Sequence, residues 1–491
     1  MISPVQLLKL FLIFSLTIVG FTEALSNEID RVQLVRELPV TGYMRDMISF
    51  NNAAFFLYSS PQGLWRSDGT DDGTKVLKSI PDSMNCGFIT QQWGNDYAPS
   101  QSNKPIVLNG HFFFYIHKQN NESELWKSNG TVDGTVLLQQ TGFGGLDSYA
   151  IVHNILYILG GHSLWRTDGT SAGTRKVATL NNAISLVSFD NRLFFASTDS
   201  THDQELWVSN GTSAGTKLFV DIKKFDTSYP CGHFTPQTCT DSDSWPRDLI
   251  VHQNTLYFTA DDGVHGRELW RSDGTTAGTR MFADIGLDED SKAFTSFTTI
   301  NNHLLFSGYD ATHGRELWIT DGSKKGTFLL ADLKSGAEGS LPLIFFAAKL
   351  NGTLYFTTWD ALWKTDGTRN GTTLVKNGLR NRYSGISSAI LNERLYFGSS
   401  LADNNNELWV TDGTPEGTSM VRDILPGKDD YGRHYSSIPQ NFVNVGSFVL
   451  FDAYYEVYDS SGGYEEYKRG LFKLERGPAN ISPTFLPLLL N

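Results

Sequence analysis

The stretch Glu268-Leu269-Trp270-Arg271-Ser272-Asp273-Gly274-Thr275-Thr276-Ala277-Gly278-Thr279 is one copy of a pattern that the chain repeats. The pattern reads Leu-Trp-x-[Ser/Thr]-[Asp/Asn]-Gly-[Thr/Ser]-x-x-Gly-Thr. Its eight tryptophans are Trp65, Trp126, Trp165, Trp207, Trp270, Trp318, Trp363 and Trp409. Neighbouring tryptophans lie between 39 and 63 residues apart (165 − 126 and 270 − 207). A repeat of this period predicts one supersecondary unit that is stacked many times.

The copy at residues 296–333 indicates that the unit has four strands. Its four runs of β-forming residues are 296–300, 303–307, 316–320 and 328–333. Asn301-Asn302 and Asp321-Gly322 suit tight turns, because Asn and Gly tolerate positive φ. We expect the Asp of each Asp-Gly to be a turn residue rather than a calcium ligand, since Asn replaces it in two copies. Four short strands in about 45 residues are typical of a β-propeller blade, and no sustained helical period favours an α/β fold.

The N-terminal part of the chain has one strand too many for its blade, and the C-terminal part has one too few. Residues 32–38 resemble a fourth strand with no blade before it. Residues 448–451 and 470–474 resemble a second and a third strand, with no fourth strand after them. We therefore expect residues 32–38 to pair with 470–474 and to close an all-β ring of nine blades without free sheet edges. Because propellers usually have roughly four to eight blades, eight blades plus an irregular flap is the alternative.

The N-terminal residues suggest a compartment. Residues 1–24 contain Lys9, an apolar run at 10–21 and a small-x-small site at 22–24, which is typical of a secretory signal peptide. A signal anchor is the alternative, although the apolar run is short for a membrane span. We expect a secreted, extracellular protein with a propeller at 27–476 and a tail at 477–491. The net charge of −13 argues against nucleic acid and anionic membranes as partners.

Sequons and cysteines agree with a secretory route. The six Asn-x-Ser/Thr sequons are at Asn121, Asn129, Asn210, Asn351, Asn370 and Asn480. The sequons at 129, 210 and 370 fall in the repeated turn, where a glycan would be exposed to solvent. The three cysteines are Cys86, Cys231 and Cys239. Because Cys231 and Cys239 share one insertion, we expect a disulfide between them; Cys86 is then unpaired, or pairs with one of them instead.

The copies of the repeat differ in length at two places, after the fourth strand and between the second and third strands. The insertions at 82–105, 223–247 and 425–440 follow fourth strands, and 454–468 lies between a second and a third strand. Both junctions open on one face of an up-and-down blade, so these insertions predict the binding face. Among their aromatic residues, the candidate binding residues are Trp93, Tyr229, Trp245, Tyr431 and Tyr455. The alternative is that these side chains cover the mouth of the channel.

The repeated pattern resembles that of the Glu-Leu-Trp-x-Thr-Asp-Gly-Thr-x-x-Gly-Thr repeat proteins, which are secreted or surface proteins found largely in bacteria. The resemblance covers about residues 30–475. It implies a propeller-like extracellular scaffold, and it implies no established activity. Gly63, Ser163 and Ala361 replace the usual Glu before Leu-Trp, and Asn129 and Asn210 replace the usual Asp.

Two loops carry the residues with the clearest chemical potential. The loops at 261–268 and 310–316 contain Asp, His, Gly, Arg and Glu in that order. The candidate metal ligands in them are Asp261, His265, Asp310 and His313, which suit calcium through carboxylates or zinc through imidazole. The alternative is that the loop arginines pair with neighbouring acids and that each His is a turn residue. No other cofactor is expected, and the sequence has no serine-nucleophile motif, phosphate loop or zinc spacing.

Two functions remain from the sequence. The favoured one is a secreted scaffold that is not an enzyme and binds matrix, cell-surface, glycan or protein ligands through the insertion loops. The alternative is a secreted propeller hydrolase or lyase, metal-assisted or not, that acts on glycans or small esters. Acids and His gathered at the channel mouth would favour the enzyme, whereas an aromatic surface built from loops would favour binding.

Overall fold

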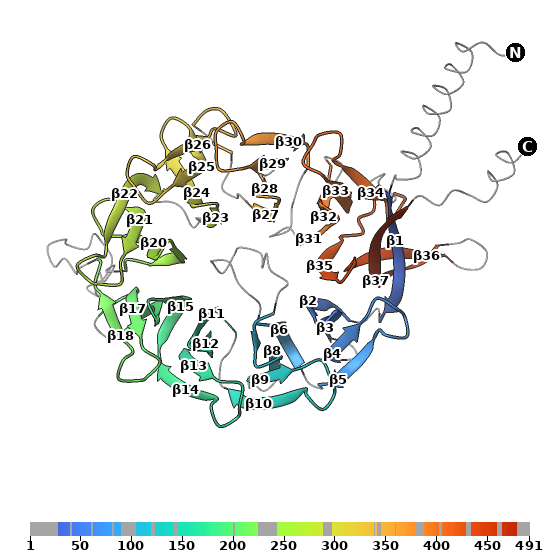
Figure 1. The fold of residues 1–491 in the computed structure, drawn as a ribbon, viewed down its shortest axis with the longest axis horizontal. Helices are drawn as coiled ribbons and strands as arrows, with labels where there is room; N and C mark the ends of the chain where they lie inside the picture. The colour runs from blue at the N-terminus through green and yellow to red at the C-terminus, as the bar shows by residue number, and fades with distance from the viewer. Residues whose placement is uncertain are drawn as a thin grey trace, which may run out of the picture.

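The chain forms a ring of nine blades (Figure 1). The computed structural model describes residues 28–39, 42–59, 62–80, 83–89, 105–118, 123–141, 146, 148–160, 162–199, 202–223, 243–287, 297–337, 339–340, 345–358, 360–379, 387–401, 405–428, 434–458 and 464–478. All the regular structure in these residues is β-strand. The sequence-based prediction of an all-β propeller with nine blades is therefore confirmed.

Each blade is an antiparallel sheet, and in every blade except blade 9 the strands follow the chain from the centre of the ring outward. Blade 1 contains β2 (Met44–Phe50), β3 (Ala53–Ser59), β4 (Gln62–Ser67) and β5 (Lys75–Ser79). Blade 2 contains β6 (Ser83–Phe88), β7 (Val107–Leu108), β8 (His111–Lys118), β9 (Ser123–Ser128) and β10 (Val136–Thr141). Blade 3 contains β11 (Ser148–Val152), β12 (Ile155–Gly160), β13 (Ser163–Thr167) and β14 (Arg175–Thr179). Blade 4 contains β15 (Asn181–Phe189), β16 (Arg192–Thr198), β17 (Glu205–Ser209) and β18 (Lys217–Val220).

The second half of the ring follows the same plan. Blade 5 contains β19 (Arg247–His252), β20 (Thr255–Asp261), β21 (Arg267–Ser272) and β22 (Arg280–Leu287). Blade 6 contains β23 (Thr298–Ile300), β24 (His303–Asp310), β25 (Gly314–Thr320) and β26 (Phe328–Ala331). Blade 7 contains β27 (Phe345–Leu350), β28 (Thr353–Thr357), β29 (Ala361–Thr365) and β30 (Thr373–Asn377). Blade 8 contains β31 (Ser388–Leu391), β32 (Arg394–Ser400), β33 (Asn406–Thr411) and β34 (Ser419–Arg422). Blade 9 contains β35 (Gln440–Val445), β36 (Phe448–Tyr458), β37 (Tyr464–Pro478) and β1 (Glu28–Leu38).

The N-terminal strand β1 closes the ring. It is the outer strand of blade 9, where Val32 is opposite Leu474 in β37, as the sequence predicted. Its backbone also bonds to the preceding blade, because Arg422 Nη1 donates to the Val32 carbonyl at 2.9 Å. On the other side, Arg36 Nη1 lies 3.1 Å from Asp71 Oδ1 of blade 1. The same short strand therefore joins three consecutive blades.

The repeated Asp-Gly turn is held by side-chain hydrogen bonds. Asp273 Oδ1 accepts from the N–H of Thr275 at 2.8 Å and from its hydroxyl at 2.7 Å. The hydroxyls of Ser272 and Thr279 meet at 2.6 Å across the base of the turn. Gly274 has a φ of 89°, a conformation that favours glycine. This pattern recurs in the other copies, so the Asp is the turn residue that the sequence predicted.

Polar latches join neighbouring blades at these turns. In blades 2, 5 and 7, the Lys or Arg after the repeated Trp donates to the carbonyl of the turn glycine in the next blade. Arg271 Nη1 donates to Gly322 O at 3.0 Å, and Lys364 Nζ donates to Gly413 O at 2.8 Å. These latches need the turns to keep a fixed length and position.

The hydrophobic core lies between blades rather than in one centre. In blade 6, Leu317 and Ile319 are buried on either side of the Trp position, and they belong to one cluster with Leu354 and Phe356 of blade 7. On the opposite face of the same strand, Trp318 packs against a cluster that contains Tyr257 and Leu269 of blade 5, so blade 6 buries apolar side chains on both of its faces. Nine such interfaces account for the apolar residues that alternate with the repeated Trp.

Two insertions differ from their predicted form. The insertion predicted at 82–105 begins with β6, which pairs with β8, so the extra chain interrupts the first strand of blade 2 instead of preceding it. Phe88 packs on Phe114 at 6.1 Å, which explains why this part is in the sheet. The segment 454–468 was predicted as a loop, but its ends extend β36 and β37 into a long hairpin in which Tyr458 is opposite Tyr464.

Candidate functional site

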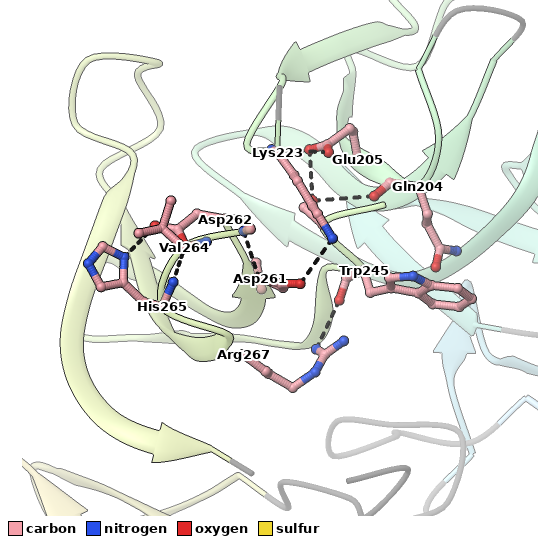
Figure 2. A network of polar contacts seen from close by, with 12 residues as sticks. Gln204, Glu205, Lys223, Trp245, Asp261, Asp262, Val264, His265 and Arg267 are labelled. Carbon is pink, nitrogen blue, oxygen red and sulfur yellow. Dashed lines mark hydrogen bonds and ion pairs between the residues drawn. The ribbon is translucent and has the colours of Figure 1, made fainter. Parts of the chain in front are cut away.

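Two segments of chain meet on one face of the ring, between blades 4 and 5 (Figure 2). We call this the insert face, because the second-to-third-strand loops and the connections between blades lie there. The N–H of Trp245, before β19, donates to the carbonyl of Gln204 in blade 4 at 3.2 Å. The N–H of Asp261, at the end of β20, donates to the carbonyl of Ser244 at 2.8 Å. Backbone hydrogen bonds to two blades therefore fix this connection.

Trp245 presents an aromatic side chain on that face. It is 39% exposed, and the Arg247 guanidinium lies 4.9 Å from its ring centroid. Its carbonyl accepts a hydrogen bond from Arg267 Nη1 at 3.0 Å (Figure 2). The φ of Trp245 is 48°, and Ile438, which also lies between a Ser and a Pro, has a φ of 49°. The two connections, before blade 5 and before blade 9, thus share this backbone conformation. The exposed indole is found at Trp245, whereas the other position has an isoleucine.

The buried side chain of Glu205 stabilises the connection between blades 4 and 5. Glu205 Oε2 accepts from the N–H of Ile222, where the chain leaves β18, at 2.8 Å. The same atom accepts from the Ser244 hydroxyl, just before Trp245, at 2.7 Å. Burial raises the pKa of Glu205 to about 7, although these hydrogen bonds act to lower it. The carboxyl group therefore ties the end of one blade to the start of the next.

The same arrangement recurs in blade 8. Glu407 Oε2 accepts from the N–H of Ile424 at 2.8 Å and from the Ser437 hydroxyl at 2.6 Å. Burial raises the pKa of Glu407 to about 7 as well. In blade 6, Glu316 accepts from the N–H groups of Leu333 and Lys334, at 2.8 and 3.1 Å, and burial raises its pKa too.

Sequence reasoning missed these glutamate–serine contacts. It noted the Glu before Leu-Trp only as a common residue of the repeat. A weak second signal was present, because three of the six Ser-x-Pro tripeptides in the chain, at 244–246, 340–342 and 437–439, follow a copy that has this Glu. The spacing between Glu and Ser ranges from 24 to 39 residues (340 − 316 and 244 − 205), so no fixed pattern links them.

The four candidate metal ligands divide between separate partners. Asp261 Oδ2 lies 3.2 Å from Lys223 Nζ, whereas His265 Nδ1 hydrogen-bonds to Asp262 at 2.8 Å (Figure 2). In blade 6, His313 Nδ1 lies 2.9 Å from Asp310. Within the described part of the chain, no three His, Cys, Asp or Glu side chains gather as a metal-ligand group.

These loops contain pairs that stabilise turns. Burial alone would raise the pKa of Asp262, but hydrogen bonds from His265 and Val264 outweigh it and hold the pKa below its usual value. The pKa of Asp310 is likewise lowered, because hydrogen bonds from His313 and Thr312 outweigh the effect of burial. His265 and His313 thus each hydrogen-bond to an Asp of their own turn, which agrees with the interpretation of them as turn residues. Arg267 Nη1 donates to Trp245 O and to the Thr259 hydroxyl, and the nearby carboxylates of Asp248 and Asp261 act to raise its pKa while burial lowers it.

The predicted aromatic binding residues have different outcomes. Trp93, Tyr229 and Tyr431 lie outside the described residues. Tyr455 belongs to β36 rather than to a loop, and its ring packs edge-on against Phe472 at 5.8 Å. Its blade lies across the ring from that of Trp245 (Figure 1). The prediction that Tyr455 lies outside the repeated strands is therefore wrong, because the hairpin extends through it.

The described residues include one of the three cysteines and four of the six sequon asparagines. Cys86 is a free, buried thiol in β6, and burial raises its pKa to about 12. Cys231 and Cys239 lie outside the described residues, as do the sequon residues Asn121 and Asn480. The other four sequon residues lie in turns. Among the described residues, no helix has the length and apolar character needed to cross a membrane.

Comparison with known proteins gives likenesses in fold. No family model and no curated protein matches the chain. A puromycin hydrolase structure is 10% identical over 71% of this chain and 57% of that chain, with a TM-score of 0.39. The β-propeller domain of the Trilobed protease from Pyrococcus furiosus is 12% identical over 65% and 96%, with a TM-score of 0.34. Prolyl oligopeptidase B from Galerina marginata is 10% identical over 86% and 54%, with a TM-score of 0.37. This chain thus spans little more than half of the two enzymes, and nothing about activity follows from these likenesses.

Proposed function

We propose that this protein is a secreted repeat scaffold that binds an extracellular glycan or protein through its insert face. The observation that carries the proposal is the exposed indole of Trp245, which a backbone bonded to two blades holds in place. Aromatic anchors on a rigid frame lose little conformational freedom when they bind, and they dominate many interfaces. Arg247 beside the ring adds a hydrogen-bond donor for a sugar hydroxyl, a carbonyl or a carboxylate.

The test compares substitutions at one surface. Purified full-length protein is passed over immobilised matrix glycans and matrix proteins, and the dissociation constant is measured for each probe that binds. Trp245→Ala should weaken binding about 30-fold, which corresponds to about 2 kcal/mol for a lost aromatic anchor. Trp245→Phe should retain most of the affinity because it keeps an aromatic face. Val264→Ala is the matched control, since Val264 is 80% exposed on the neighbouring loop.

The enzyme alternative predicts a different set of results. If the protein is a hydrolase or lyase, glycans or small esters should be turned over, and Asp310→Asn or His313→Ala should abolish that turnover. Trp245→Ala would then leave the measured interactions unchanged. That combination would refute the binding proposal in favour of the enzyme. Asp262 and Asp310 have lowered pKa values and pair with His265 and His313, so we favour binding.

A further inference from the structure

The face opposite the insert face is built from turns. We call it the turn face; it contains the turns between first and second strands and between third and fourth strands. Contacts between neighbouring blades show that both kinds of turn share this face. Asn109 Nδ2, in the first turn of blade 2, donates to the Asp168 carbonyl in the last turn of blade 3 at 3.4 Å. Asn301 of blade 6 makes the same contact with Asp366 of blade 7 at 3.1 Å.

All the sequon asparagines that the structure describes lie on the turn face. Asn129, Asn210 and Asn370 are in turns between third and fourth strands, and Asn351 is in the turn between β27 and β28. Asn210, Asn351 and Asn370 are exposed, and Asn129 is half-buried. An ideal Cβ at Gly352, beside Asn351, would meet nothing within 4 Å, so there is open space at this turn. These four sequons are thus on the face that does not carry Trp245.

Two of these asparagines occupy the Asp position of the repeat without disturbing the turn. Asn129 Oδ1 accepts from the N–H of Thr131 at 3.0 Å and from its hydroxyl at 2.7 Å. These are the two bonds that Asp273 Oδ1 makes with Thr275. Asn210 repeats them with the threonine two residues after it. Only the amide oxygen is needed for the turn, so the amide nitrogen can carry a substituent.

We propose that the turn face carries N-linked glycans at Asn129, Asn210, Asn351 and Asn370, and that the insert face around Trp245 stays open to the ligand. The inference rests on the proposed secretory route. In the transfer, the amide nitrogen bonds to the anomeric carbon of an oligosaccharide donor linked to a polyprenyl diphosphate. The bond from that carbon to the diphosphate oxygen breaks, the diphosphate leaves with the electron pair, and the nitrogen loses one proton to the transferase. The amide oxygen, which is the acceptor in the turn, is unchanged.

The repeat supplies matched variants for the test. Asn129→Asp and Asn210→Asp restore the common residue of the turn, so each should remove one glycan and leave the melting temperature unchanged. Asp273→Asn keeps the same acceptor atom and completes a new Asn-Gly-Thr sequon. It should add one glycan, again without a change in the melting temperature of the enzymatically deglycosylated protein.

Full-length protein is expressed in a eukaryotic secretory host, and site occupancy is read by peptide mass spectrometry before and after glycosidase treatment. One form has its own residues 1–24, and the other has an unrelated secretion signal in their place. Suppose that only the form with the unrelated signal is secreted, and that its four sites carry glycans. This result would contradict the proposed secretory route of the natural chain, but it would support the proposal that the turn face carries glycans. Secreted protein in which these four sites are empty would overturn the inference, even if secretion itself succeeds. Loss of folding in Asn129→Asp would also contradict it.

Discussion

The unfolding free energy of this protein should rise when the pH falls from 8 to 5. Glu205 and Glu407 have folded-state pKa values of about 7, raised by burial from an ordinary 4.5. Between pH 4.5 and 7 the folded protein keeps these protons, while the unfolded chain has lost them. Their contribution to stability is therefore complete below pH 4.5 and is lost as the pH rises through 7.

The size of the effect follows from the two pKa values. Integrated between about pH 5 and pH 8, a shift of this size changes the unfolding free energy by about 2.5 kcal/mol per carboxyl group. Glu316 acts in the same direction, because burial raises its pKa as well. The turn aspartates act outside this range, since hydrogen bonds from Thr275 hold the pKa of Asp273 below 3.8. Two groups should thus give a change of about 5 kcal/mol.

Urea unfolding at several pH values between about 5 and 8 measures this change. Glu205→Gln and Glu407→Gln remove the titrating group but keep an oxygen that can accept from Ile222 or Ile424. Each variant should lose about 2.5 kcal/mol of the pH dependence and the double variant about 5 kcal/mol, while the contribution of Glu316 should remain. Glu416→Gln, at an exposed turn position, controls for the substitution itself. If the double variant keeps the slope of the unaltered protein, these carboxyl groups are not the cause and the reasoning fails.

Three other predictions concern ring closure, turn geometry and thiols. Deletion of residues 28–38 removes β1 and should abolish cooperative thermal unfolding; a truncated protein that melts like the intact one would disprove closure by β1. Gly274→Ala places a Cβ at a φ of 89° and 2.8 Å from an arginine, so chemical denaturation should show a loss of about 1–3 kcal/mol, and an unchanged midpoint would argue against strain. Non-reducing peptide mapping should find Cys231 linked to Cys239, with Cys86 alkylated only after unfolding; a free Cys231 or a linked Cys86 would contradict this.

The repeat allowed most of the fold to be predicted because its information is local. The Asp-Gly turn, the strand after it and the apolar positions beside Trp318 all lie within a dozen residues of one another. Ring closure was also predictable, since the unpaired strand at 32–38 and the missing strand after 470–474 match in type. A nine-bladed ring follows from counting these units.

The parts that were missed depend on contacts between distant residues. Glu205 accepts a hydrogen bond from the hydroxyl of Ser244, which is 39 residues away across an insertion. A repeating sequence pattern cannot predict a contact at such a separation. The insertions themselves do not repeat, so neither β6 nor the hairpin of β36 and β37 could be found from the pattern. The surroundings of Trp245 come from two blades, and the sequence alone does not show which loops meet.

The latches and the glutamates explain why the two faces differ. On the turn face, Arg271 and Lys364 each reach a glycine carbonyl of the next blade, so an extra residue in that turn would move the acceptor away. On the insert face, Glu205 and Glu407 hold both ends of a connection close to the sheet. The chain between those ends can therefore vary in length without disturbing the ring. Trp245 directly follows Ser244, the last residue that Glu205 holds. A side chain at this position can therefore be exposed at little cost to folding.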